Sequence, residues 1–239
     1  MVRAMLPDRF HGVWRRDWID RRSTGEGAPV RDTSPAIWFQ SLCSHVDLRV
    51  DPTLIGKSTS AFTVCPTQTA FAGNTTVQVR DGKELCQWHQ RIAYPGLSEE
   101  VDCGYMEFQS ANHVIETGID GSYVESWRRI NHGETMRCFR FELSTDSAKQ
   151  CYLMLGRRFF ALGSNVAGAE DPLVPVYAWG ESAEAPNQWR VRESLVPYWI
   201  DRELEIDSRI VEFSSPPLDS LAWVLPVLPG KDWRLISIE

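Results

Sequence analysis

Long apolar runs are missing from this 239-residue chain: no stretch approaches the roughly 18 apolar residues that a membrane-spanning helix needs. Also missing is any long polar or low-complexity tract, so the composition gives no reason to expect disorder. The segment "MVRAMLPDRF" (1–10) lacks the apolar centre of a secretory signal peptide. We therefore expect a folded cytoplasmic protein without a membrane association.

The motifs that mark nucleotide and metal chemistry are absent as well. The sequence holds no P-loop, no Gly-rich dinucleotide fingerprint, no G-x-S-x-G nucleophile elbow and no H-E-x-x-H zinc motif. Its six cysteines stand far apart, with no C-x-x-C pair and no histidine at zinc spacing. These absences predict that the protein uses no cofactor and no metal. They also favour cysteines that pack as small buried hydrophobes.

Positive charge is in short supply. Lysine and arginine number 25 against 32 aspartates and glutamates, and the formal net charge is −7. This balance argues against nucleic acid, or an anionic membrane surface, as the main partner. The chain is instead rich in aromatic residues, with ten Trp and ten Phe, which suit a large β core and equally suit an aromatic ligand.

Strand signals dominate from residue 36 onward. No convincing helical period competes with them up to about residue 130, and in the second half only 194–205 is a candidate for a short helix. The segment 36–50 is rich in β-branched and aromatic residues, typical of one long strand or of two strands joined at a bend. Alternation counted straight through this segment places Trp38 and Gln40 on one face together with Val46 and Leu48.

Two further segments complete an antiparallel pattern in the first half. Residues 69–94 carry Asp81-Gly82 between two alternating runs, the composition of a tight hairpin turn. Residues 104–130 contain three short alternating runs separated by turn residues. The first half is therefore predicted to be an up-and-down sheet long enough to close into a barrel.

The same pattern begins again at residue 137. The expected strands of this half are 137–144, 149–164, 174–180, 187–191, 205–213, 220–228 and 232–239. We predict an all-β fold of antiparallel up-and-down barrels in two related halves. The first barrel spans 8–132, and a second, smaller barrel-like half spans 137–239.

The stretch "FHGVWRRDWI" (10–19) opens the first half. In a small closed barrel, a glycine before the first strand lets the chain cross the barrel floor, and a Trp two residues later plugs that end. Gly12 and Trp14 have this spacing. Arg128 and Arg129, at the end of the meander, are candidates for an arginine that lies across the Trp14 ring.

An N-terminal G-x-W with a closing arginine resembles the calycin superfamily, the lipocalins and fatty-acid-binding proteins. A second resemblance covers most of the chain: "AFAGNTTV" (70–77), "CQWHQRI" (86–92), "VIETG" (114–118), "YVESWRRI" (123–130), "LMLGRRFF" (153–160) and "DWRLISIE" (232–239). This order is similar to that of the fungal casein-kinase-interacting (HRI) β-barrel family. The resemblance implies a lipocalin-like fold and carries no established reaction. The chain departs from that family at Arg158, where the family has Trp.

Polar residues inside strand-like segments are the candidates for chemistry, because a ligand-holding barrel needs a few fixed polar groups among apolar walls. Alternation in "SYVESWRR" (122–129) places Tyr123 and Glu125 on the face of Trp127. A buried carboxylate is either paired or neutral with a raised pKa, and the second state suits a general acid or base. The alternative for Glu125 is a structural ion pair with one of three arginines: Arg15, Arg16 or Arg91.

Two further residues are candidates for acid–base or hydrogen-bonding roles. Glu116 lies in "VIETGIDG" (114–121), and its alternative role is to accept backbone N–H bonds at a strand end. His89 faces away from Trp88 and Gln90, and its alternative is a satisfied structural histidine. The catalytic candidates are Glu125, Glu116, Tyr123 and His89. The substrate-binding candidates are Trp38, Gln40, Trp88, Gln90, Phe108, Trp127 and Arg158. Arg158 is read as a clamp for an anionic group or as the Trp-capping arginine of the second half.

Three functions fit these residues. The first is a cofactor-independent acid–base enzyme, of lyase or isomerase type, acting on a small aromatic molecule in a barrel pocket. The second is a protein that binds such a ligand without turnover. The third is a protein-interaction module whose barrels are filled by their own side chains. A homodimer is compatible with the sequence, which does not give the oligomeric state.

Overall fold

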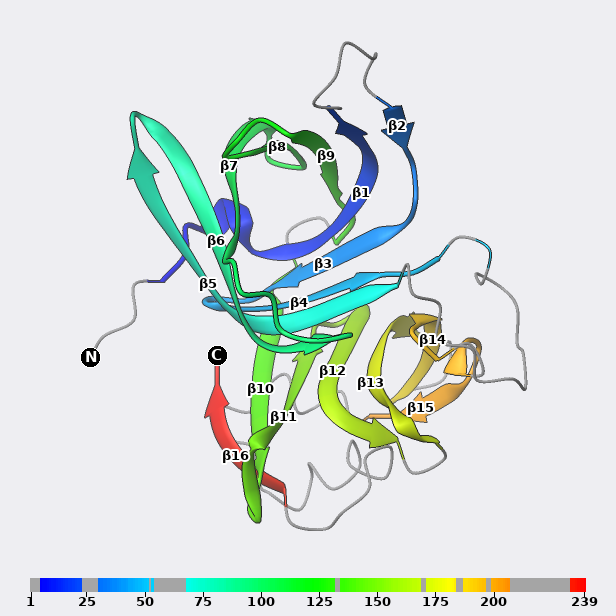
Figure 1. Ribbon diagram of the computed structural model, residues 1–239. Coiled ribbons are helices and arrows are strands. Elements are labelled where there is room, and N and C mark those ends of the chain that lie inside the picture. Colours follow the sequence, from blue (N-terminus) through cyan, green and yellow to red (C-terminus); the bar gives the residue numbers. More distant parts are fainter. Residues whose placement is uncertain are drawn as a thin grey trace.

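The computed structural model describes residues 5–22, 30–51, 53, 68–131, 134–168, 171–183, 187–196, 199–206 and 233–239 (Figure 1). The side chains of 167–168 and 171–175 lie outside that description. Antiparallel strands make up almost all of the regular structure in these ranges, with one 3₁₀ turn, η1 (Asp8–Phe10), before the first strand. The fold is all-β, as the sequence predicts.

The first sheet has nine strands. They are β1 (Gly12–Arg21), β2 (Val30–Asp32), β3 (Ala36–Gln40), β4 (Ser44–Arg49), β5 (Thr69–Arg80), β6 (Lys83–Tyr94), β7 (Asp102–Ser110), β8 (His113–Gly118) and β9 (Tyr123–Arg129). Eight of them close into an antiparallel barrel, because β1 pairs with β3 on one side and with β9 on the other. Strands β3 to β8 each pair with the next strand along the chain, so the barrel is up-and-down and calycin-like. Closure leaves these eight strands without an open edge.

The turns follow the predicted chemistry in the later part of this barrel. Asp81 and Gly82 form the β5–β6 turn with positive φ angles of 53° and 74°, which matches the expected hairpin. Gly121 lies in the β8–β9 turn at φ 72°. The meander from β7 to β9 is therefore confirmed.

The segment 36–50 is a hairpin, and this corrects the face assignment made by straight alternation. The turn at 41–43 resets the parity, and Trp38 pairs with Asp47 while Gln40 pairs with His45. Because directly paired residues point to the same face of a sheet, His45 and Asp47 share the barrel interior with Trp38 and Gln40. Val46 and Leu48, predicted on the Trp38 face, point outward instead.

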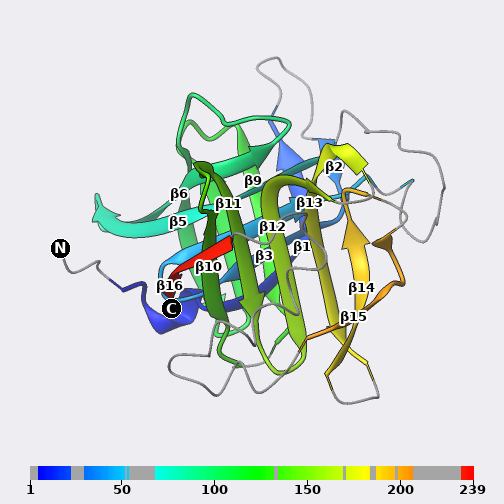
Figure 2. The same cartoon turned by 90° about the horizontal axis from the view of Figure 1, so that it is seen from below.

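The second sheet has seven strands. In chain order they are β10 (Arg137–Leu143), β11 (Asp146–Leu155), β12 (Phe159–Gly168), β13 (Asp171–Ser182), β14 (Gln188–Ser194), β15 (Glu203–Glu205) and β16 (Trp233–Ile238). Figure 2 shows them side by side, with β16 next to β10 at one edge and β15 at the other. Within the described ranges these two edge strands do not pair, so closure of this half stays a prediction. Of the expected strands, 205–213 and 220–228 lie outside the described residues apart from 205 and 206.

The two sheets share a hydrophobic core. Ile37, Val46 and Leu48, on the outside of the barrel, pack in one cluster with Tyr152 and Met154 of β11. The next residues of β11, Leu153 and Leu155, pack into a second cluster on the opposite face of the sheet. Because both faces of the second half of β11 are buried, residues 151–155 form a continuous apolar run instead of an alternating one.

No helix in the described ranges has the length and apolar character to cross a membrane.

The barrel is plugged at one end, which we call the closed end. It lies where β1 starts and where β7 and β9 finish. Trp14 is fully buried there, and its indole N–H donates to the carbonyl of Phe10 at 2.8 Å. The Arg129 guanidinium lies 4.7 Å from the Trp14 ring centroid and donates to the carbonyl of Arg9. The predicted plug and its covering arginine are confirmed.

Gly12 is required at this end. Its φ is +133°, and a Cβ there would lie 2.6 Å from Oδ1 of Asn131. That same oxygen accepts the backbone N–H of Val13 at 3.0 Å. A side chain at position 12 would therefore displace the contact that ties β1 to the segment after β9.

Candidate functional site: the mouth of the first barrel

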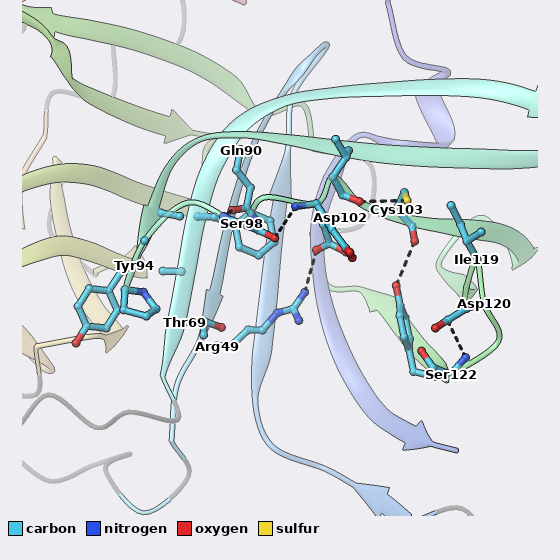
Figure 3. A pocket seen from close by; sticks show the side chains of 18 residues that line it. Arg49, Thr69, Gln90, Tyr94, Ser98, Asp102, Cys103, Ile119, Asp120 and Ser122 are labelled. Atoms are coloured by element: carbon cyan, nitrogen blue, oxygen red, sulfur yellow. Dashed lines mark hydrogen bonds and ion pairs between the residues drawn. The ribbon is translucent and has the colours of Figure 1, made fainter. Parts of the chain in front are cut away.

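A pocket of about 610 Å³ occupies the opposite end of the barrel, which we call the mouth (Figure 3). Its walls come from the ends of β4 and β6 and from the starts of β5, β7 and β9, together with residues of the segments 95–101 and 119–122, which follow β6 and β8. In an up-and-down barrel these strand ends all lie at one rim, so the topology itself gathers the lining residues. Aromatic side chains in the lining are Phe71, Tyr94 and Tyr123.

An arginine between two aspartates lies at the base of this pocket. Arg49 Nε donates to Asp47 Oδ1 at 3.0 Å, and Arg49 Nη2 lies 3.8 Å from Asp102 Oδ2 (Figure 3 shows the contact with Asp102). The side chains of Arg49 and Asp102 are 30% and 29% exposed, whereas that of Asp47 is 5% exposed. Arg49 and Asp102 therefore face the pocket, with Asp47 behind them.

Glu116 lies below the mouth and is held by two fixed donors. The Tyr123 hydroxyl donates to its Oε1 at 2.8 Å, and the Trp127 indole N–H donates to its Oε2 at 3.1 Å. A Cβ on Gly104 would lie 2.6 Å from Glu116 Cγ, so the absence of a side chain there makes room for the carboxyl group. Tyr123 itself lines the pocket and so connects Glu116 to it.

Glu125 pairs with Glu116 across β8 and β9 and belongs to an ion pair. Arg16 Nη1 donates to Glu125 Oε1 at 2.8 Å, and both side chains are 2% exposed. Arg16 Nη2 also donates to the carbonyl and hydroxyl oxygens of Ser34. The structural pair weighed for Glu125 in the sequence is therefore present, with Arg16 as the partner.

Burial changes the protonation of the acids that lack a full partner. Burial raises the pKa of Glu116 well above its usual range, and the charges of Glu125 and Asp102 raise it further. The pKa of Asp47 rises to about 6, mainly through burial, although Arg49 counters the shift. The pKa of Asp102 is also raised by burial. Burial and the nearby Glu116 carboxyl raise the pKa of Tyr123, so its hydroxyl stays protonated.

The structure brings together three of the four predicted catalytic residues, Glu116, Tyr123 and Glu125. The fourth, His89, lies on the outer face of β6, where its Nε2 is 2.9 Å from Thr76 Oγ1. Gln90 lines the pocket, and its Oε1 accepts the backbone N–H of Ser98 at 3.4 Å.

The other predicted binding residues lie away from this pocket. Trp38, Trp88 and Trp127 pack in the barrel interior, with centroid distances from Trp38 of 5.5 Å to Trp88 and 6.1 Å to Trp127. Phe108 packs on Phe10 at the closed end, with a centroid distance of 4.9 Å.

Two more predicted binding residues have structural surroundings. Gln40 is fully buried, and it accepts the Trp38 indole N–H at 3.0 Å. Its amide group donates to the carbonyl of Ser44 at 2.9 Å. Arg158 is exposed between β11 and β12 of the second sheet, and its backbone N–H donates to Glu134.

The sequence did not single out Asp47, Arg49 or Asp102. The signal available for the first two was their shared face with His45 in an apolar segment, because charged residues inside a buried strand need partners. Straight alternation hid that signal, because it placed His45, Asp47 and Arg49 on the face opposite Trp38. Asp102 is the first residue of β7, two residues before the predicted segment 104–130, and has no distinguishing pattern around it.

Cys86, Cys138 and Cys151 are buried and form no disulfide. In the described part of the chain, no group of three or more His, Cys, Asp or Glu side chains is arranged to hold a metal ion.

No protein-family model, curated protein or solved structure shows significant similarity to this chain. The case for a function therefore depends on the geometry of the mouth.

Proposed function

We propose that the protein binds a small organic molecule in the mouth of the first barrel and transfers a proton on it, as a lyase or isomerase does. The observation that carries this proposal is the pocket of about 610 Å³ that opens directly above buried carboxyl groups with raised pKa values. Perturbed acids in a cleft are typical of acid–base sites, although structural pairs perturb them as well. The aromatic lining favours an aromatic ligand.

The residues divide into a base and an acid. Asp102 is partly exposed to the pocket, and its raised pKa makes it a stronger base than an ordinary aspartate. Tyr123 is the acid, with Glu116 behind it. When Glu116 is protonated, its proton passes to the Tyr123 oxygen across the 2.8 Å contact as the Tyr123 proton passes to the ligand.

Hydrogen–deuterium exchange tests this proposal. Phenylacetone is a small aromatic carbon acid, and its α-protons are followed by NMR in D₂O with and without protein. We expect exchange faster than in buffer, with about a hundredfold or greater loss in Asp102→Asn and a smaller loss in Tyr123→Phe, in line with the usual contribution of a general base. His89→Gln, on the outer face of β6, is the control and leaves exchange unchanged.

Two results would count against proton transfer: exchange no faster than in buffer, or equal exchange in the protein and the Asp102→Asn variant. If phenylacetone still shifts the amide signals of the pocket segments, the protein binds without turnover. That second function is favoured by one observation. Glu116 and Glu125 accept hydrogen bonds from fixed donors, and neither lines the pocket.

We also propose that the chain is related to the fungal casein-kinase-interacting family, which the order of its motifs from 70–77 to 232–239 supports. A pure protein-interaction module was expected to have barrels filled by their own side chains. The closed end fits that expectation, with Trp14, Trp38 and Trp127 packed together. The pocket at the mouth favours a ligand instead.

A further inference from the structure

The barrel interior near the mouth holds more acidic than basic groups. Four carboxyl groups lie there, on Asp47, Asp102, Glu116 and Glu125, against two guanidinium groups, on Arg16 and Arg49. Arg16 pairs with Glu125, and Arg49 lies between Asp47 and Asp102. Glu116 has no guanidinium partner among the described residues and is held by neutral donors. The cluster therefore holds two more carboxyl groups than guanidinium groups.

The pocket above this cluster has the same imbalance. Its lining contains three acids, Glu100, Asp102 and Asp120, and one strongly basic residue, Arg49. Because Arg49 already contacts two carboxylates, it is not available to neutralise an anionic ligand. A cation entering the pocket would meet the carboxylates and also the faces of the aromatic lining, which attract cations.

Exposed apolar side chains form the rim of the pocket. Six large apolar residues are exposed in the described ranges, and three of them gather here: Leu97 at 60%, Val101 at 46% and Ile119 at 45% exposure. Val101 and Ile119 line the pocket, and Leu97 lies between two residues that do. Since exposed apolar residues that cluster are typical of binding sites, the rim indicates a ligand with an apolar body.

We propose that the ligand is an organic cation, an amine or quaternary ammonium group carried on an apolar or aromatic body. Its charged group lies at Asp102, and its body lies against Phe71, Tyr94 and the rim. This inference rests on the proposed pocket and names its ligand class. It is independent of whether a proton is transferred there.

Three probes of similar shape and different charge test the ligand class: benzylamine, benzyl alcohol and benzoate at neutral pH. Binding to the full chain is followed by the amide NMR shifts of residues 94–103. We expect benzylamine to bind about tenfold or more tightly than benzyl alcohol, and benzoate to bind least, because each carboxylate attracts the cation and repels the anion. High salt should weaken the binding of benzylamine and leave the binding of benzyl alcohol unchanged.

Two variants on one strand separate the site from general charge effects. Asp102→Asn should weaken the binding of benzylamine about tenfold and change the binding of benzyl alcohol by no more than about twofold. Glu107→Gln removes one negative charge from the exposed, outward face of β7 and should change the affinity for neither probe. If Asp102→Asn does not fold, the rim variant Asp120→Asn and the salt dependence give the same comparison.

The outcomes distinguish the two proposals. Equal binding of benzylamine and benzyl alcohol, or tighter binding of benzoate, overturns the proposal that the ligand is a cation. The pocket would then remain a binding site for another class of ligand. Failure of all three probes to shift the pocket signals overturns the pocket itself, and the ligand class with it.

Discussion

The two ends of the first barrel are built from the same eight strands and have opposite interiors. The closed end is filled by Trp14, Trp38 and Phe108, and the indole N–H of Trp14 has a fixed acceptor. The mouth contains buried acids that the arginines beside them only partly neutralise, below an open pocket. An arrangement that stability alone selected would extend the apolar packing, since buried ion pairs add little to stability. The difference supports the binding role that we propose for the mouth.

The largest expected effect is at the closed end. Trp14→Ala should lower the free energy of unfolding by about 3–5 kcal/mol, because it leaves a cavity in a fully buried aromatic cluster. Trp18→Ala is a matched control, since that half-buried ring contacts Arg31, and about 1 kcal/mol is expected. Denaturant unfolding measures both variants. Equal losses would show that the closed end is no more tightly packed than the outer surface.

The next effect separates the two facing glutamates at the mouth. Glu125→Gln should cost about 3 kcal/mol, because it leaves the Arg16 guanidinium buried without its carboxylate. Glu116→Gln should cost less than about 1 kcal/mol, since a neutral amide can accept from Trp127 and donate to the Tyr123 oxygen. Denaturant unfolding at neutral pH tests this order. A larger loss for Glu116→Gln would mean that Glu116, and not Glu125, carries the charge that the fold requires.

The two ends of the barrel also differ in how much of their structure could be predicted from the sequence. The closed end could be predicted, because Gly12, Trp14 and Arg129 are fixed by backbone geometry and by their positions at the two ends of one meander. Turn residues with positive φ, such as Asp81 and Gly82, likewise give the hairpin directly.

The mouth could be predicted only in part. Tyr123, Glu116 and Glu125 follow from alternation within β8 and β9. Asp47 and Arg49 were missed because the short turn at 41–43 reverses the parity of everything after it. Asp102 meets Arg49 only when β4 and β7, more than fifty residues apart in the chain, are brought to one rim. Such contacts depend on strand register and barrel closure, which local pattern does not specify.

The stability of the mouth should depend on pH through Asp47. The folded pKa of Asp47 is about 6, above the ordinary value of 3.8, so the folded state holds its proton more tightly than the unfolded chain does. The resulting stability is fully present below about pH 4 and is lost as the pH rises through 6. Arg49 on β4, Asp102 on β7 and Glu125 on β9 face this carboxyl group.

Asp47→Asn removes that titration. The unfolding free energy of the variant minus that of the unaltered protein should therefore increase by about 2 kcal/mol between pH 4 and pH 7. Asp17→Asn, which removes a partly exposed aspartate paired with Arg128, is the control for the loss of a carboxylate outside the barrel interior. A difference that stays constant with pH would mean that Asp47 is ionised at every pH tested.

The smallest expected effect is at the arginine that covers the closed end. Arg129→Met should cost about 1 kcal/mol, because it removes a cation from the Trp14 ring face and a donor from the Arg9 carbonyl while keeping much of the side-chain volume. Arg128→Met, one residue earlier, removes an exposed arginine paired with Asp17 and should cost less than about 0.5 kcal/mol. Thermal and denaturant unfolding compare the two variants. Equal costs would mean that Arg129 acts as a surface charge, and the closed end would then depend on the packing of Trp14 alone.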